Sequence, residues 1–163
     1  MGPRKWPFIY RGMINTVAIK KNNDFIIVYR KGKYYAGKHM ILYALKANPG
    51  SDGCGDIVGC ARNSLGIVAS KKVGNSVRRN RLKRLIKENY RHIEEYVKIG
   101  YSFVFVARVR QDGNEQNIMQ NNKQSIMPSI MPSYEEIRVE MKHLLSRAGA
   151  LDRQKWEQSQ SGA

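Results

Sequence analysis

The sequence predicts an α+β fold in which a single domain contains a four-stranded mixed sheet packed by three helices. Apolar runs of strand length alternate with longer segments whose apolar residues recur at helical spacing, and glycines or cap residues separate them. The 163 residues suffice for one domain with a substantial core, whereas two domains would leave each with a small one. The predicted order is helix, strand, strand, strand, helix, strand, helix.

The first predicted helix covers residues 23–31, although its Ile and Val residues also suit a strand. Its ends favour a helix, because Asn23 or Asp24 is a suitable N-cap and Gly32 suits a left-handed residue after the last turn. One face of this helix then carries Phe25, Val28 and Tyr29.

Three strands are predicted next, at 33–36, 39–46 and 65–70. The run 39–46 is apolar at both odd and even positions, so we expect it to be buried on both faces. The Gly-rich segment 47–64 is too long for a tight hairpin and is interpreted as a flexible insertion.

The central feature of the chain is a basic helix that begins after Gly74. Residues 71–91 contain nine Lys or Arg and one acid, Glu88, and nothing interrupts a helix between an N-cap at Asn75 or Ser76 and Gly100. The apolar side, which should face the core, carries Leu82, Leu85, Ile86, Tyr90, Ile93 and Val97. The polar side and its flanks carry Arg79, Asn80, Arg81, Lys83, Arg84, Lys87 and Arg91.

A charged helix face is often only solvated, but such faces usually mix Lys with Glu at spacings of four residues. Here acids are nearly absent and like charges repel along the helix, as between Arg79 and Lys83. A polyanionic partner explains that cost better than solvation does.

The rest of the chain completes the sheet. The strand predicted at 101–109 follows the basic helix, so the strands on either side of that helix should be parallel. The polar segment 111–132 is interpreted as a second, disordered insertion. A capping box at Ser133–Glu136 starts the last helix, which ends before Gly149. Residues 1–16 are expected to form a loosely ordered basic arm, residues 17–151 the domain, and residues 152–163 a polar tail.

The charge and the residue composition indicate which classes of function to expect. A net charge of +16 makes a nucleic acid the first partner to test. No run of apolar residues is long enough to span a membrane and no secretory signal begins the chain, so a cytoplasmic protein is expected. Cys54 and Cys60, without a nearby His, cannot complete a zinc site and are interpreted as free thiols. Acids and histidines are scattered, so we expect no catalytic side chains and no metal site in the protein itself.

The basic segment resembles the signature of the bacterial ribonuclease P protein component in the residues Lys71-Lys72-x-Gly74-x-x-Val77-x-Arg79-Asn80-Arg81-x-Lys83-Arg84-Leu85-Ile86. The first helix is similar as well, with its Asp-Phe pair at Asp24, an aromatic residue four positions later and a closing Gly. The general rule for parallel strands favours a right-handed crossover, but the resemblance implies an unusual left-handed βαβ crossover.

The resemblance implies a protein that binds a catalytic RNA and precursor tRNA, while the RNA subunit and Mg²⁺ cleave the 5′ leader. No membrane and no protein partner are implied. The residues implied to bind the catalytic RNA are Arg79, Asn80, Arg81, Lys83, Arg84, Lys87 and Arg91. The residues implied to line a cleft for the leader are Phe25, Tyr29, Tyr43, Lys71 and Lys72.

Two alternatives are weighed against this interpretation. The chain can be a ribosomal or other structured-RNA-binding protein with a similar fold and no link to a nuclease. It can also be a DNA-binding protein that places the basic helix in the major groove. A strand rather than a partner helix precedes Asn75, which disfavours a helix-turn-helix motif.

Overall fold

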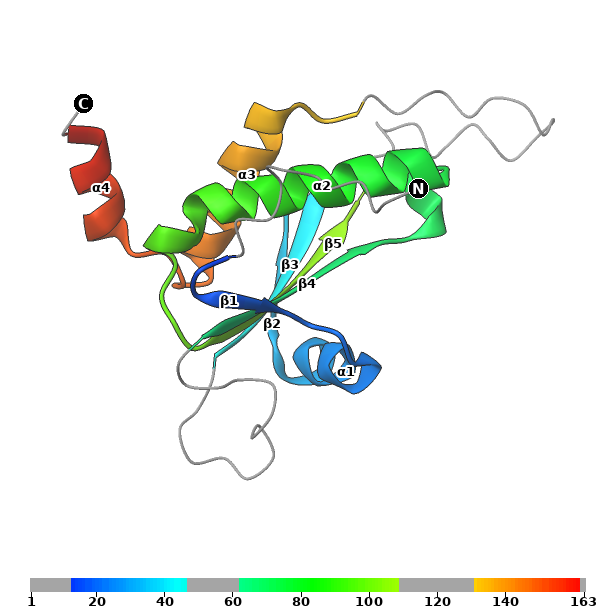
Figure 1. The fold of residues 1–163 in the computed structure, drawn as a ribbon, viewed down its shortest axis with the longest axis horizontal. Helices are drawn as coiled ribbons and strands as arrows, with labels where there is room; N and C mark the ends of the chain where they lie inside the picture. Colours follow the sequence, from blue (N-terminus) through cyan, green and yellow to red (C-terminus); the bar gives the residue numbers. More distant parts are fainter. Residues whose placement is uncertain (1–12, 47–61, 109–130, 162–163) are drawn as a thin grey trace, which may run out of the picture.

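The structure, a computed structural model, describes residues 13–46, 62–108 and 131–161 (Figure 1). Its strands are β1 (Thr16–Ala18), β2 (Lys33–Ala36), β3 (Met40–Lys46), β4 (Asn63–Ala69) and β5 (Tyr101–Ala107). Its α-helices are α1 (Asn22–Lys31), α2 (Ser76–Ile93), α3 (Tyr134–Arg147) and α4 (Arg153–Ser161), and two short 3-10 helices are η1 (Lys71–Val73) and η2 (Glu94–Tyr96). The predicted α+β class and the predicted order of helices and strands from α1 to α3 are confirmed.

The sheet is mixed, with the strand order β1-β4-β5-β3-β2. The strands on either side of α2, β4 and β5, are parallel neighbours as predicted, and β3 runs antiparallel to both β5 and β2. The predicted count of four strands is wrong, because β1 adds a fifth strand parallel to β4. Three residues are too few to show a period, so β1 left no readable pattern in the sequence.

Contacts to α2 and its C-terminal end hold β1 in place. The hydroxyls of Thr16 and Tyr90 lie 3.2 Å apart in a buried hydrogen bond. The buried carboxylate of Glu94 accepts hydrogen bonds from the backbone N–H groups of Ile14 (3.1 Å) and Asn15 (2.9 Å). The Tyr90 side chain is buried at this contact, and burial is the main reason that the pKa of its hydroxyl is raised.

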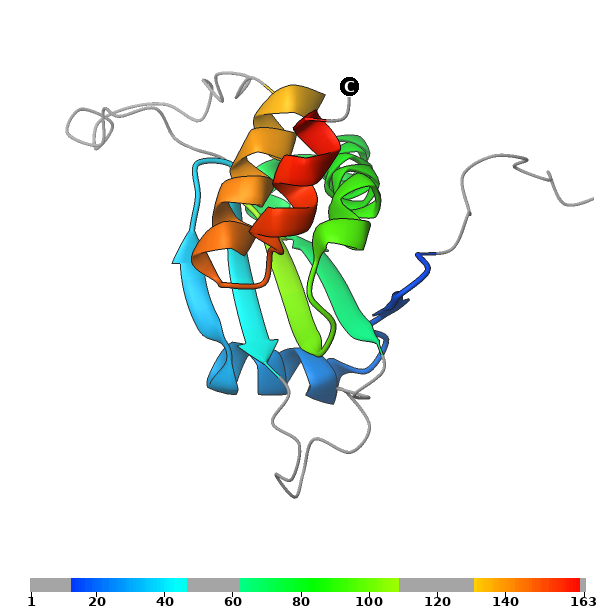
Figure 2. The ribbon, with the colours of Figure 1, turned by 90° about the vertical axis from the view of Figure 1, so that its left-hand side faces the viewer.

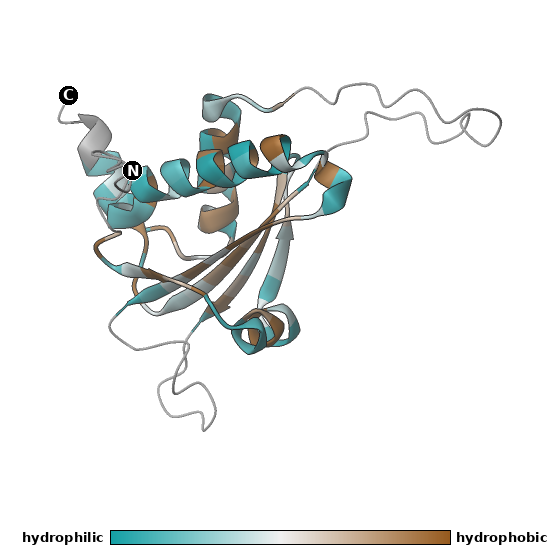
Figure 3. Ribbon diagram, turned by 45° about the vertical axis from the view of Figure 1, so that its right-hand side comes forward, coloured by the Kyte–Doolittle hydropathy of each residue, from teal (hydrophilic) through white to brown (hydrophobic). Residues whose placement is uncertain are grey.

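The helices cover the two faces of the sheet unequally (Figures 1 and 2). Helices α2 and α3 pack on one face over the main hydrophobic core, where the rings of Phe103 and Phe105 lie about 6 Å from that of Tyr90, at 6.1 and 6.2 Å. Among the described residues, α1 is the one helix on the opposite face, and its Val28 is fully buried. Figure 3 shows the middle of the sheet in brown, as apolar, and most of α2 in teal, as polar.

The predicted ends of α1 are wrong in detail. The N-cap is Lys21, and Asn23 and Asp24 lie in the first turn. Gly32 has φ −75° and ψ 152°, which is extended rather than left-handed. A Cβ atom at position 32 would lie 2.3 Å from the carbonyl oxygen of Val28, so close packing and not backbone handedness requires a glycine there.

Helix α2 begins as predicted, with the Asn75 side chain accepting a hydrogen bond from the backbone N–H of Arg78 (3.0 Å). Its predicted extension to Gly100 is wrong, because α2 ends at Ile93 and η2 follows. The predicted core face is buried except for Leu85, which is half-buried.

The capping box of α3 is confirmed in both directions, since Ser133 and Glu136 each bond the other's backbone N–H, at 3.2 and 2.8 Å. The predicted polar tail instead includes α4. The Trp156 ring lies 4.8 Å from that of Tyr96, and the Lys142 ammonium lies 3.8 Å from the centre of the Trp156 ring. Most of the arm predicted at 1–16 and most of the insertions predicted at 47–64 and 111–132, with Cys54 and Cys60, lie outside the described residues.

Candidate nucleic-acid interface

The solvent side of α2 carries most of the predicted RNA-binding residues. Those exposed to solvent are Asn80, Arg81, Lys83, Arg84 and Lys87. No acidic side chain lies on α2 before Glu88, so these charges form a continuous positive strip along the first three turns. Such a surface attracts a phosphate backbone because each contact releases condensed counterions. We call this set of residues the basic ridge.

The other two predicted RNA-binding residues, Arg79 and Arg91, already form interactions within the protein. Arg79 is half-buried, and its guanidinium donates to the carbonyl oxygen of Gly74 (3.3 Å). Arg91 is half-buried and forms an ion pair with Glu88, whose carboxylate also lies 3.4 Å from the ring of His92. The net positive charge of the helix is therefore concentrated toward its N-terminal part.

The face of the sheet that carries α1 is only partly covered. Cross-strand pairs place Ala36, Ile41, Val106 and Val68 in one row across β2, β3, β5 and β4. Ala36 is exposed and the other three are half-buried. We call this row the open strip. It is apolar and runs perpendicular to the strands.

The aromatic residues predicted to bind the leader lie next to the open strip, on the side where α1 packs. The rings of Tyr29 and Tyr43 meet edge to face with centroids 4.8 Å apart. The ring of Phe25 lies over Gly66, where a Cβ atom would come within 2.4 Å of it. Burial first, and the nearby Tyr43 second, raise the pKa of Tyr29, so its hydroxyl is neutral at physiological pH. The structure thus brings Phe25, Tyr29 and Tyr43 to one face of the sheet, as predicted.

Lys71 and Lys72 connect this face to the basic ridge. Both are exposed and lie in η1, directly after the C-terminal end of β4 and before the N-cap of α2. Gly74 between them and α2 has φ 131°, a conformation that favours glycine. All twelve predicted site residues lie in the described part of the chain, on α1, β3, η1 and α2.

Sequence reasoning missed two residues that shape this surface, Tyr34 and Glu140. Tyr34 is 55% exposed and its ring lies 5.5 Å from that of Tyr43, so the aromatic cluster extends to the edge strand β2. The pairing Tyr34↔Tyr43 required the β2–β3 register, which the sequence does not show. Glu140 of α3 accepts hydrogen bonds from the backbone N–H groups of His39 and Met40, at 2.8 to 3.0 Å, and holds the start of β3.

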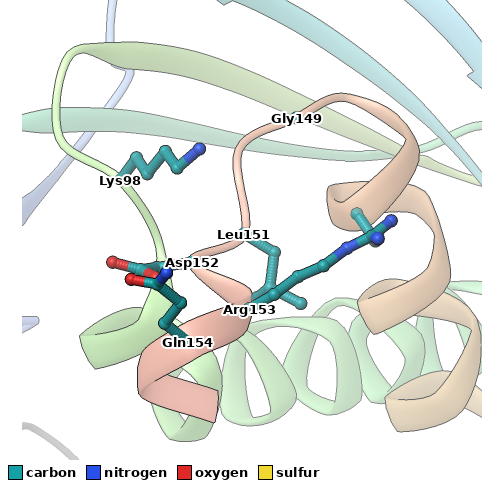
Figure 4. Close-up of a pocket in the computed structure, with 7 residues that line it drawn as sticks. Lys98, Gly149, Leu151, Asp152, Arg153 and Gln154 are labelled. Carbon is teal, nitrogen blue, oxygen red and sulfur yellow. The ribbon is translucent and has the colours of Figure 1, made fainter. Parts of the chain in front are cut away.

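A pocket of about 350 Å³ lies elsewhere, at the turn between α3 and α4 (Figure 4). It is lined by Lys98, Leu151 and Asp152 among others, and the guanidinium of Arg153 donates to the Ser146 hydroxyl (3.0 Å) at its side. None of the predicted site residues lines it.

The described part of the chain shows neither a cluster of metal-binding side chains nor a membrane-spanning helix. No group of three or more His, Cys, Asp or Glu side chains is placed to hold a metal ion within residues 13–46, 62–108 and 131–161. In the same ranges, no helix has the length and apolar character needed to cross a bilayer.

The chain is similar in sequence to proteins of one known family. The chain matches the Ribonuclease P family over residues 13–149. It is 36% identical over 141 residues to the ribonuclease P protein component of Clostridium perfringens, covering 85% of this chain and 94% of the relative. It is 39% identical over 131 residues to that of Clostridium beijerinckii, covering 80% of this chain and 87% of the relative.

Solved structures show the same fold. The RNase P protein of Staphylococcus aureus superimposes with a TM-score of 0.57 at 26% identity, over 82% of this chain and 96% of that one. The RNase P protein of Thermotoga maritima superimposes with a TM-score of 0.56 at 20% identity, over 80% of this chain and 96% of that one, a likeness of fold alone. The chain belongs to the Ribonuclease P family of protein components.

Proposed function

We propose that this chain is the protein subunit of the ribonucleoprotein ribonuclease P, which binds the catalytic RNA and the 5′ leader of precursor tRNA and assists removal of that leader. The observation that carries the proposal is an acid-free basic ridge on the solvent side of α2, together with an apolar, partly exposed face on the opposite side of the sheet. Membership of the family supports it. The alternative of an RNA-binding protein unrelated to a nuclease is not favoured by these relatives.

The basic ridge is the proposed binding site for the catalytic RNA. Arg81, Lys83 and Arg84 project from a rigid helix whose inner face is locked by Leu82 and Ile86 in the core. The fixed spacing along the helix lets several cations meet successive phosphates of a folded RNA at once. Arg79 and Arg91 are proposed to contribute less, because each already bonds within the protein.

The open strip and the aromatic residues beside it are the proposed leader site. Phe25, Tyr29 and Tyr43 offer ring surfaces, and stacking on such rings contributes about 1–3 kcal/mol per base without regard to sequence. Lys71 and Lys72 are placed to meet the leader's phosphates between this face and the basic ridge. Tolerance of base identity suits a subunit that must accept many leaders.

The chemistry of cleavage is proposed to reside in the RNA subunit with Mg²⁺ bound mainly by RNA. The role of this chain's own residues is to hold and orient the two RNAs, so that the scissile bond meets the catalytic RNA more often. A cytoplasmic location, the absence of any required protein partner, and the left-handed crossover between β4 and β5 remain predictions from the family resemblance.

Reconstitution tests the proposal. A bacterial ribonuclease P RNA is assayed on precursor tRNA at limiting Mg²⁺, with and without the purified chain. Cleavage at the mature 5′ end should rise strongly when the protein is added, and the protein alone should cleave nothing. An absence of stimulation would favour the plain RNA-binding protein, and trimming by the chain without RNA would refute the assignment of catalysis to the RNA.

A further inference from the structure

The sheet edge at β2 combines an exposed aromatic ring with a run of positive charge that the proposed function does not use. Residues 25–46 contain no Asp or Glu. The five Lys and Arg side chains in this segment are all exposed, namely Arg30, Lys31, Lys33, Lys38 and Lys46. They lie at the end of α1, in β2, between β2 and β3 and at the end of β3, and Tyr34, which is itself 55% exposed, lies in β2. The edge therefore has the charge of a surface for polyanions and a ring that is open to solvent.

Tyr34 is positioned by its neighbours rather than free to turn. The register pairs Tyr34 directly with Tyr43, so both rings stand on the face that carries α1. Their centroids lie 5.5 Å apart, and Tyr43 in turn contacts Tyr29 at 4.8 Å. Three rings thus form one continuous aromatic path from α1 to β2, the last strand of the sheet.

Among the described residues, the acid nearest to the turn after β2 is Glu140. It lies close to Gly37 and accepts hydrogen bonds from the backbone N–H groups of His39 and Met40. Glu140 keeps its charge, but the five Lys and Arg side chains of residues 25–46 outnumber it, so the β2 edge keeps a net positive charge.

We propose that Tyr34 is a further leader-positioning residue, which stacks a nucleotide of single-stranded RNA as the leader leaves the open strip over the β2 edge. The proposal rests on the proposed function and extends the leader's path beyond Phe25, Tyr29 and Tyr43. Lys31 and Lys38, exposed at the two ends of β2, supply the phosphate contacts at this exit.

The geometry sets which leaders reach Tyr34. The open strip crosses four strands, so its three spacings of about 4.8 Å give a length of about 14 Å. At about 3.4 Å per stacked nucleotide, a leader needs about four nucleotides to cross it. A leader of about two nucleotides therefore ends before Tyr34, and one of about eight passes it.

The experiment compares Tyr34→Ala with wild type in the reconstituted holoenzyme, using precursor tRNAs that differ only in leader length. The variant should lose roughly fivefold or more in affinity for the long-leader substrate, equivalent to about 1 kcal/mol, and nothing for the short one. Tyr34→Phe keeps the ring and should bind like wild type. Tyr35→Ala is a matched control, because Tyr35 is the next residue and points to the opposite face of the sheet.

The outcomes separate the two proposals. If wild-type protein stimulates cleavage and favours the long leader but Tyr34→Ala behaves the same at both lengths, the role of Tyr34 is refuted while the proposed function stands. An equal loss for both leaders would also refute it, since Tyr34 would then act on folding or on catalytic-RNA binding. If wild-type protein stimulates nothing, the proposed function itself fails. Circular dichroism and thermal unfolding of each variant identify any loss due to misfolding.

Discussion

The contact between Gly66 and Phe25 makes the aromatic side of the leader site sensitive to a single methyl group. A Cβ atom at position 66 would lie 2.4 Å from Cε1 and 2.9 Å from Cζ of the Phe25 ring. Carbon atoms in contact normally lie about 3.5–4.0 Å apart, so in Gly66→Ala the ring must move by about 1 Å or more. Overpacking of this kind costs about 1–3 kcal/mol.

A double-mutant cycle isolates this contact from other effects of the substitution. Replacing a strand glycine by alanine also stabilises by about 0.5–1 kcal/mol through the unfolded chain, which masks part of the clash. In a Phe25→Ala background the ring is absent, so Gly66→Ala should then be neutral or slightly stabilising. The coupling energy between the two positions should be about 1–3 kcal/mol.

Urea unfolding followed by circular dichroism measures the four free energies of unfolding. The same Gly66→Ala should weaken binding of a long leader in the reconstituted enzyme, because the Phe25 ring no longer lies where the leader stacks. If Gly66→Ala changes the free energy of unfolding equally with and without the Phe25 ring, the reasoning from this contact is refuted.

Three further predictions concern the ridge, the first strand and the last core helix. Arg84→Ala should lower the slope of log K against log salt for RNA binding by about one unit without changing the free energy of unfolding. Lys155→Ala is the control, because Lys155 is exposed on α4, and it should leave the slope unchanged. If Arg84→Ala has the same slope as wild type, the RNA binds elsewhere. Glu94→Ala leaves the N–H groups of Ile14 and Asn15 without their acceptor and should lower the free energy of unfolding by roughly 1–3 kcal/mol. Hydrogen exchange at those two amides should become faster. Unchanged exchange would show that Glu94 does not hold this segment. The pKa of Glu136 is lowered from 4.5, chiefly by the backbone N–H of Ser133, so its contribution to stability is present above pH 4.5 and is lost as the pH falls through its folded-state pKa. Glu136→Ala should therefore have a lower free energy of unfolding than wild type at neutral pH, and the two proteins should differ less in acid. A difference between their free energies of unfolding that grows in acid would refute this prediction.

Sequence patterns predicted the elements that repeat a period over many residues. The exposed and buried sides of α2 follow from helical spacing alone, and the parallel neighbours β4 and β5 follow from the strand-helix-strand order. Asn75 and the Ser133 capping box were predictable because their hydrogen bonds are local.

What sequence could not supply depends on partners far apart in the chain. Contacts with Tyr90 and Glu94 hold β1 and the residues before it in place, and the packing of Trp156 on Tyr96 holds α4. Tyr34 was overlooked for the same reason, since only the register of β2 and β3 brings it beside Tyr43.

The position of β1 has a consequence for how the protein is made. Its first residues emerge earliest from the ribosome, yet Glu94, which binds Ile14 and Asn15, comes 80 and 79 residues later. The strand that pairs with β1, β4, is synthesised earlier, but the side-chain contacts with Tyr90 and Glu94 can form only after α2 has been made. The segment before β1 is therefore fixed in place only when synthesis has passed Glu94, the first residue of η2.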